Sequence, residues 1–209
     1  MSPRSGSGSD FPSSGAEAGG VTPRIWREWR EARTLARRAA SYVASVRAEP
    51  ADADAQWLAE CATRGDIDHA RWELRYARRA LGLIAAQRDA LDDRTPSAVA
   101  REVAASLARE PLVDAAKREV AERQFNQRLR AYADVLAERG EGEPTAARLG
   151  RALLAFAGGG VTPAPADVTR AGALVSSYLA EGSAALQAVF GAAELPEHVS
   201  PSVAAAERG

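Results

Sequence analysis

The sequence predicts an all-α protein, an antiparallel bundle of long amphipathic helices followed by a C-terminal helical pair, with disordered termini. From Ile67 to Leu91, apolar residues follow one another at alternating steps of three and four, interrupted only by Arg88, and this spacing forms one side of a long helix. No stretch alternates apolar and polar residues for long enough to indicate a sheet. Proline and glycine divide the chain into segments of helical length.

The N-terminal part of the chain contains a tail and two predicted helices. Residues 1–21 are rich in serine and glycine, so they cannot bury enough apolar area to offset the entropy of ordering, and we expect a disordered tail. A helix is predicted over 22–48, because a Thr-Pro pair suits its start and its apolar residues again step by three and four. This apolar stripe runs from Ile25 and Trp29 to Val46 and is expected to face inward. A shorter helix is expected over 51–63, before Gly65.

Five more helices are predicted after this point. Asp66 can cap the long helix that ends near Leu91, and a second Thr-Pro pair starts a helix over 95–109. The remaining helices are expected over 112–139, around Leu149 to Phe156, and over 166–190. In terms of domains, we expect a helical bundle over 22–140, a C-terminal helical pair that packs on it over 141–196, and a flexible tail over 197–209.

The long helix that begins after Asp66 has a second apolar side. Trp72, Tyr76 and Leu83 lie roughly opposite the stripe that starts at Ile67. Either this helix lies at the centre of the bundle, or one side meets another copy of the chain. Packing considerations favour the central position, and the three residues are the candidate apolar interaction face.

The first predicted helix is rich in arginine. Residues 23–48 hold seven arginines and two glutamates, a local charge of +5, and most of the arginines lie opposite the apolar stripe. The candidate basic face consists of Trp26, Arg27, Arg30, Arg33 and Arg37. Such a face could hold phosphates, anionic lipid headgroups or acidic protein. The alternative is a solvated face whose arginines pair with acidic residues elsewhere, with Asp52, Asp54 and Glu60 as the nearest choices.

Two further ridges concern helix packing. An arginine ridge on the long helix predicts a ladder of ion pairs along a seam of the bundle, formed by Arg71, Arg75, Arg78 and Arg79. A ridge of small residues on the last helix predicts close packing within the fold in preference to a dimer seam, and it consists of Gly172, Ser176, Ala180, Ala184 and Ala188.

Composition restricts the class of protein. The 209 residues have a formal charge of -1, so the molecule as a whole has no field that would concentrate it on nucleic acid or anionic lipid. Cys61 is the single cysteine, which excludes an intrachain disulfide. We find no signal peptide and no apolar run long enough for a transmembrane segment, and we expect a cytoplasmic protein.

Catalytic and metal-binding residues are scarce. The chain has two histidines, and the nearest approach to a metal site is the group Asp66, His69 and Glu73. The alternative is that Asp66 caps the helix and that His69 lies on its surface beside Glu73. Cys61 lies at an inward-looking helix position, and no nucleophile or nucleotide-binding motif is present. We therefore predict no catalytic, cofactor or metal residues and lean against an enzyme.

The predicted function follows from the two candidate faces. The first expectation is protein–protein interaction or homo-oligomeric scaffolding through Trp72, Tyr76 and Leu83, with a protein partner or a second copy. The alternative is binding of nucleic acid or an anionic surface through the arginine-rich helix at about 23–48.

Overall fold

The computed structural model describes residues 23–110, 115–138, 142–158 and 162–191. These residues form seven packed helices and no strand, which confirms the all-α prediction. The observed ends differ from the predicted ones by a few residues, and the tails predicted over 1–21 and 197–209 lie outside the described residues. The helices are α1 (Pro23–Val46), α2 (Asp52–Cys61), α3 (Ile67–Asp89), α4 (Arg94–Ala108), α5 (Ala115–Ala137), α6 (Thr145–Gly158) and α7 (Pro165–Phe190).

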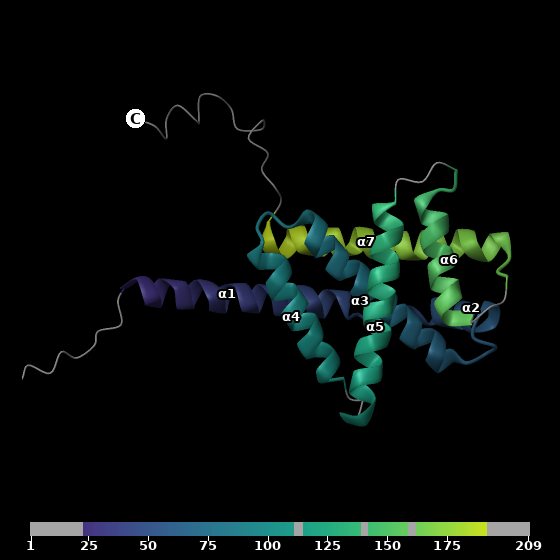
Figure 1. Ribbon diagram of the computed structural model, residues 1–209, viewed down its shortest axis with the longest axis horizontal. Coiled ribbons are helices and arrows are strands. Elements are labelled where there is room, and N and C mark those ends of the chain that lie inside the picture. The colour runs from purple at the N-terminus through teal and green to yellow at the C-terminus, as the bar shows by residue number, and fades with distance from the viewer. Residues whose placement is uncertain (1–22, 111–114, 139–141, 159–161, 192–209) are drawn as a thin grey trace, which may run out of the picture.

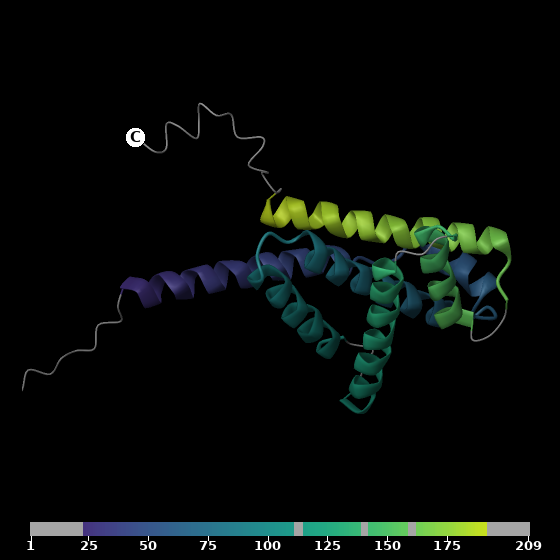
Figure 2. The same ribbon diagram turned by 45° about the horizontal axis from the view of Figure 1, so that its top comes forward.

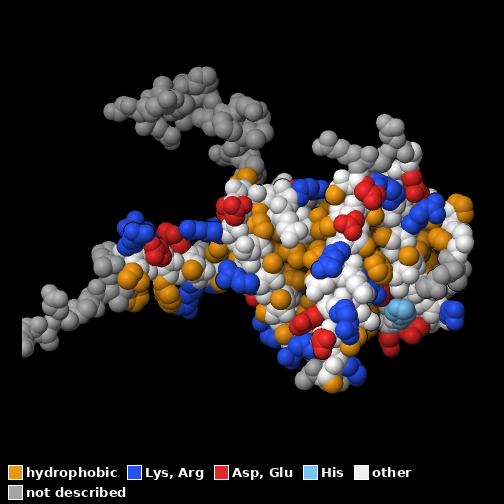
Figure 3. Space-filling view, viewed as in Figure 1, with side chains coloured by type: hydrophobic (Ala, Val, Ile, Leu, Met, Phe, Trp, Pro, Cys, Tyr) orange, Lys and Arg blue, Asp and Glu red, His pale blue; other side chains and the backbone are white. Residues whose placement is uncertain are grey.

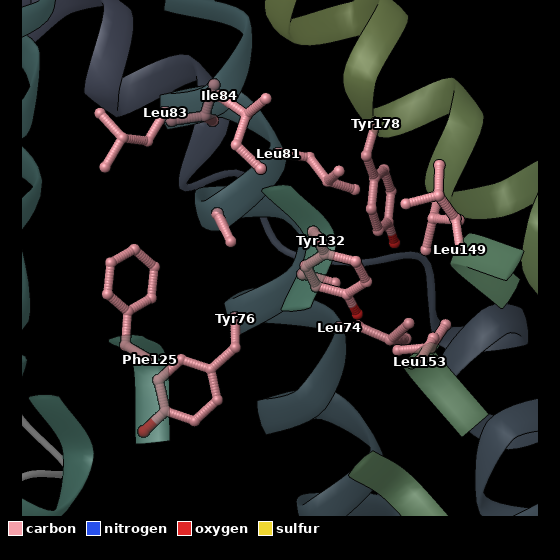
Figure 4. Close-up of a cluster of buried hydrophobic side chains, with 14 of the residues drawn as sticks. Leu74, Tyr76, Leu81, Leu83, Ile84, Phe125, Tyr132, Leu149, Leu153 and Tyr178 are labelled. Atoms are coloured by element: carbon pink, nitrogen blue, oxygen red, sulfur yellow. The ribbon is translucent and has the colours of Figure 1, made fainter. Parts of the chain in front are cut away.

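Helix α3 is the centre of the fold. It contacts all six other helices, and α7 runs along it while α5 and α6 lie across them (Figure 1; Figure 2). Along its predicted stripe, Leu74, Ala77 and Leu81 are completely buried. Side chains from α3, α5, α6 and α7 meet in one core, where Tyr132 and Leu153 approach Leu74 (Figure 4). The central position favoured by the two apolar sides of α3 is the observed one.

Aspartates cap two of the helices. The Asp66 carboxylate accepts a hydrogen bond of 2.9 Å from the backbone N–H of His69, as the sequence predicts for the start of α3. At the start of α4, the Asp92 carboxylate accepts a bond of 2.6 Å from the backbone N–H of Thr95, and this bond holds the pKa of Asp92 below its usual value. Helix α4 begins at Arg94, one residue before the Thr-Pro pair.

Glycines allow α6 and α7 to cross at very short distance. A methyl group on Gly150 would lie 2.5 Å from the carbonyl oxygen of Val168, and one on Gly172 would lie 2.5 Å from that of Ala146. Neither position leaves room for a side chain. The first residue of the predicted small-residue ridge, Gly172, therefore serves packing within the fold.

Helix α1 is only half covered. Its C-terminal half is anchored in the core by Tyr42, Val43 and Val46, whereas its N-terminal half projects beyond the bundle (Figure 1; Figure 2). Ile25 and Trp29, which the apolar stripe places on the inward side, are 53% and 51% exposed. The stripe continues past the point where the neighbouring helices end, so no described element covers its first two turns.

Candidate functional site

The apolar side of α3 that the sequence nominates as an interaction face is filled within the chain. Tyr76 is 4% exposed and Leu83 is 5% exposed, and the Phe125 ring of α5 lies 6.3 Å from the Tyr76 ring. Trp72 is half-buried, and the Arg75 guanidinium stacks over its ring at 5.1 Å. Leu83 borders a hollow that α4 and α5 also line, and its side chain is almost fully covered there. This side therefore serves the core in the isolated chain.

The residues considered for a metal site have other roles. Asp66 caps α3, and the buried Glu73 carboxylate receives two hydrogen bonds from the Arg128 guanidinium, at 3.0 Å and 2.6 Å. His69 lies at the surface, its Nε2 atom 3.4 Å from Glu73. The described residues hold no group of three side chains that could bind a metal ion together.

The cysteine is not placed for nucleophilic chemistry. Cys61 is half-buried at the end of α2, where its Sγ atom lies 3.8 Å from the carbonyl oxygen of Leu58. Burial, reinforced by the nearby Asp167 carboxylate, raises the pKa of the thiol. A raised pKa lowers the thiolate fraction, and the thiolate is the reactive form.

The arginine ridge of α3 forms the predicted ladder of ion pairs. Arg71 lies 3.0 Å from Asp52, and Arg75 lies 2.8 Å from Glu49. Arg78 lies 2.6 Å from Glu181, and Arg79 lies 2.7 Å from Glu110. Asp52 lies in α2, Glu49 in the α1–α2 connection, Glu181 in α7 and Glu110 just after α4. The ladder therefore ties α3 to its neighbours and takes up acidic residues that α1 could otherwise use.

The arginines of the candidate basic face are not neutralised in this way. Within the described part of the chain, none of the arginines of the candidate basic face forms an ion pair; these are Arg27, Arg30, Arg33 and Arg37. The acidic residues proposed as their partners are bound elsewhere. Asp52 pairs with Arg71, Asp54 lies 3.6 Å from Arg170, and Glu60 accepts a hydrogen bond from Gln56.

Tryptophan and arginine side chains form one cluster on the projecting half of α1. The rings of Trp26 and Trp29 meet edge to face, with their centroids 6.0 Å apart. The Arg33 guanidinium lies 5.2 Å from the centre of the Trp29 ring, and Arg30 Nε donates a hydrogen bond of 3.4 Å to the carbonyl oxygen of Trp26. We call this cluster, together with Ile25 and Arg37, the α1 surface, which comprises Ile25, Trp26, Trp29, Arg30, Arg33 and Arg37. Arg37 lies one turn after Arg33, where α1 already faces Ala188 and Val189 of α7.

Two hollows lie where α1 leaves the bundle. One, of about 760 Å³, lies between α1, the α3–α4 turn and the end of α7, and the other, of about 970 Å³, lies between α1 and the start of α4. Arg27 and Glu31 line both hollows and Arg30 lines the first, whereas Trp26, Trp29 and Arg33 line neither. The structure thus separates Arg27 from the tryptophans and places it on the side toward the bundle. Figure 3 shows hydrophobic, basic and acidic side chains along the projecting helix.

The chain was also compared with known proteins. No family model, curated protein or solved structure matches it. Among the described helices, none combines the length and the apolar character needed to cross a bilayer.

The sequence did not reveal two features of these sites. The exposure of Ile25 and Trp29 was missed because the apolar stripe of α1 is continuous, although two tryptophans among closely spaced arginines were a local signal. The Glu73–Arg128 pair was missed because 55 residues separate its members, and no local pattern joins them.

Proposed function

We propose that the chain is a binding protein that attaches to a negatively charged partner through the projecting half of α1. The observation that carries this proposal is the α1 surface itself. Trp26 and Trp29 are about half exposed, and the arginines beside them have no acidic partner among the described residues. Large exposed aromatic side chains next to unpaired guanidinium groups are typical of binding surfaces.

The charge distribution supports this function. Residues 24–38 hold six arginines and two glutamates, although the whole chain has a formal charge of -1. At physiological ionic strength, salt screens the attraction between opposite charges beyond about 8 Å. A partner in contact with α1 therefore feels the local excess of positive charge, even though the total charge of the chain is balanced.

Protein–protein interaction or homo-oligomeric scaffolding stays a prediction. Its nominated residues are Trp72, Tyr76 and Leu83, two of which lie in the core. Self-association through α1 would bring two clusters of unpaired arginines together, and like charges oppose such a contact. A measured mass well above 22.0 kDa at physiological salt would favour the scaffold.

Retention of the full chain on immobilised heparin tests the proposed function. We expect elution by salt, and we expect the Arg30→Ser, Arg33→Ser, Arg37→Ser variant to elute at much lower salt, because each neutralised contact reduces the salt dependence. The matched control removes three exposed arginines that form no ion pair in the described part of the chain, Arg64, Arg118 and Arg130. Unchanged retention of the α1 variant, or an equal loss in the control, would contradict the proposal.

A further inference from the structure

We infer that the negatively charged partner is the interface of an anionic lipid bilayer, on which α1 lies with Ile25, Trp26 and Trp29 at the boundary between headgroups and acyl chains. This inference rests on the proposed function and names its partner. A helix that lies in a membrane interface needs an apolar side that enters the boundary and cationic groups at the level of the phosphates.

The apolar side is present and accessible. Ile25, Trp26 and Trp29 are 53%, 52% and 51% exposed and lie within two turns of α1. Both ribbon views show this part of the helix projecting beyond the bundle (Figure 1; Figure 2). Tryptophan suits this location because its ring is apolar while its N–H can still bond to headgroups or water.

The cationic groups lie beside that apolar side. Arg33 stacks on Trp29, and Arg30 is held against the backbone of Trp26. A guanidinium group offers a planar fork of donors that matches the oxygens of a phosphate. Each arginine near an anionic membrane surface contributes attraction of the kind that juxtamembrane basic segments show.

The acidic groups of α1 lie on a different side. Glu28 and Glu31 both line the hollow between α1 and α4, which contains none of the three apolar residues. Glu28 is also neutralised by Arg24, at 2.8 Å. Trp26, Trp29 and Arg33 line neither hollow, so a surface that contacts the two tryptophans meets Arg33 and not the carboxylates that line the hollows.

The same details argue against nucleic acid as the partner. A stacking platform for bases needs open ring faces, but Arg33 already covers one face of Trp29, and the two tryptophan rings contact each other. Ile25 adds an aliphatic side chain that has no function in base stacking. Next to two indoles, it enlarges an apolar patch that a bilayer boundary can bury.

Co-sedimentation of the full chain with vesicles tests this inference. We expect binding to vesicles of phosphatidylcholine with phosphatidylserine and much weaker binding to phosphatidylcholine alone. The Arg30→Ser, Arg33→Ser, Arg37→Ser variant should lose on the order of 100-fold in partition coefficient, about fivefold for each arginine. Trp26→Ala with Trp29→Ala should lose about tenfold or more, and Trp26→Leu with Trp29→Leu should retain most of the binding.

The controls separate this inference from the proposed function. The variant without Arg64, Arg118 and Arg130 should bind vesicles like the unmodified chain. Retention on heparin or binding to duplex DNA without binding to anionic vesicles would overturn the lipid assignment and leave the proposed function standing. If the chain bound neither heparin or DNA nor anionic vesicles, the lipid assignment and the proposed function would both be overturned. Vesicle binding that the double tryptophan-to-alanine variant keeps in full would also overturn the inference, because the apolar side would then have no part in it.

Discussion

Arg128 and Glu73 form a buried salt bridge with two hydrogen bonds, from Nε to Oε2 at 3.0 Å and from Nη2 to Oε1 at 2.6 Å. The pair joins α5 to the centre of α3. The Arg128 guanidinium also lies 4.6 Å from the centre of the Phe156 ring of α6. One arginine thus connects three helices in the interior.

Removal of Arg128 should destabilise the fold strongly. In Arg128→Ala, Glu73, which is 3% exposed in the intact chain, would lose its cation, and an uncompensated buried charge costs about 3–5 kcal/mol in unfolding free energy. Urea denaturation followed by circular dichroism measures the loss. The double variant Glu73→Gln, Arg128→Met should lose less than Arg128→Ala, and a larger loss in the double variant would show that the charge is not the cause.

Two buried tyrosine hydroxyls should respond oppositely to removal. Tyr42 donates a hydrogen bond of 2.6 Å to the carbonyl oxygen of Gly82, whereas the buried hydroxyl of Tyr178 has no partner among the described residues. We expect Tyr42→Phe to lose about 1 kcal/mol and Tyr178→Phe to be neutral or slightly stabilising. Parallel urea titrations of the two variants compare them. Equal losses would mean that the Tyr178 hydroxyl is bonded after all.

Stability should fall in alkaline solution. Burial raises the pKa of Tyr178 to about 12, with a smaller contribution from Asp54, and burial also raises the pKa values of Tyr42 and Tyr132. A tyrosine in the unfolded chain loses its proton near pH 10, so the folded state binds more protons above this pH. Each of these tyrosines should therefore lower the free energy of unfolding by about 1.4 kcal/mol per pH unit, between about pH 10 and its pKa in the folded state.

Urea midpoints measured from pH 8 to pH 11 check the sign of this effect. The stability that the protonated tyrosines contribute is complete below pH 10 and is lost as the pH rises. Tyr178→Phe should reduce the dependence of stability on pH by the contribution of the single Tyr178 hydroxyl. A slope that this substitution leaves unchanged would mean that Tyr178 does not take part.

Alanine at Gly172 should destabilise the contact between α6 and α7. The new methyl group would lie 2.5 Å from the carbonyl oxygen of Ala146, so the two backbones must separate, at a cost of about 1–3 kcal/mol. Gly158→Ala is the matched control, because its methyl group would meet no atom closer than 3.4 Å. Thermal unfolding should show a lower midpoint for Gly172→Ala alone.

The tryptophans of α1 should matter little for stability. We expect Trp26→Ala and Trp29→Ala each to change the unfolding free energy by no more than about 0.5 kcal/mol, because both side chains are half exposed. Trp57→Ala should cost about 3–5 kcal/mol, because Trp57 is 9% exposed and donates a hydrogen bond of 3.2 Å to Asp167. A large loss at Trp26 would show that α1 is covered in solution.

The helices and their ends were predictable because the signals are local. The three-and-four spacing before Leu91, the Asp66 cap and the Pro and Gly breaks act over a few residues of the chain. The spacing of the arginines on α3 was also enough to predict a row of ion pairs along this helix. The acidic partners were not predictable, since Arg75 and Arg78 pair with Glu49 and Glu181, which lie in other elements.

Local periodicity was enough to specify which side of each helix is apolar, but not which apolar side remains open. Two such sides were known from the sequence, one with Tyr76 and Leu83 on α3 and one with Ile25 and Trp29 on α1. Helix packing buries the first within the bundle and leaves the second uncovered. The reason is that coverage depends on neighbours distant in the chain: α3 is surrounded by six helices, whereas the first turns of α1 extend beyond all of them.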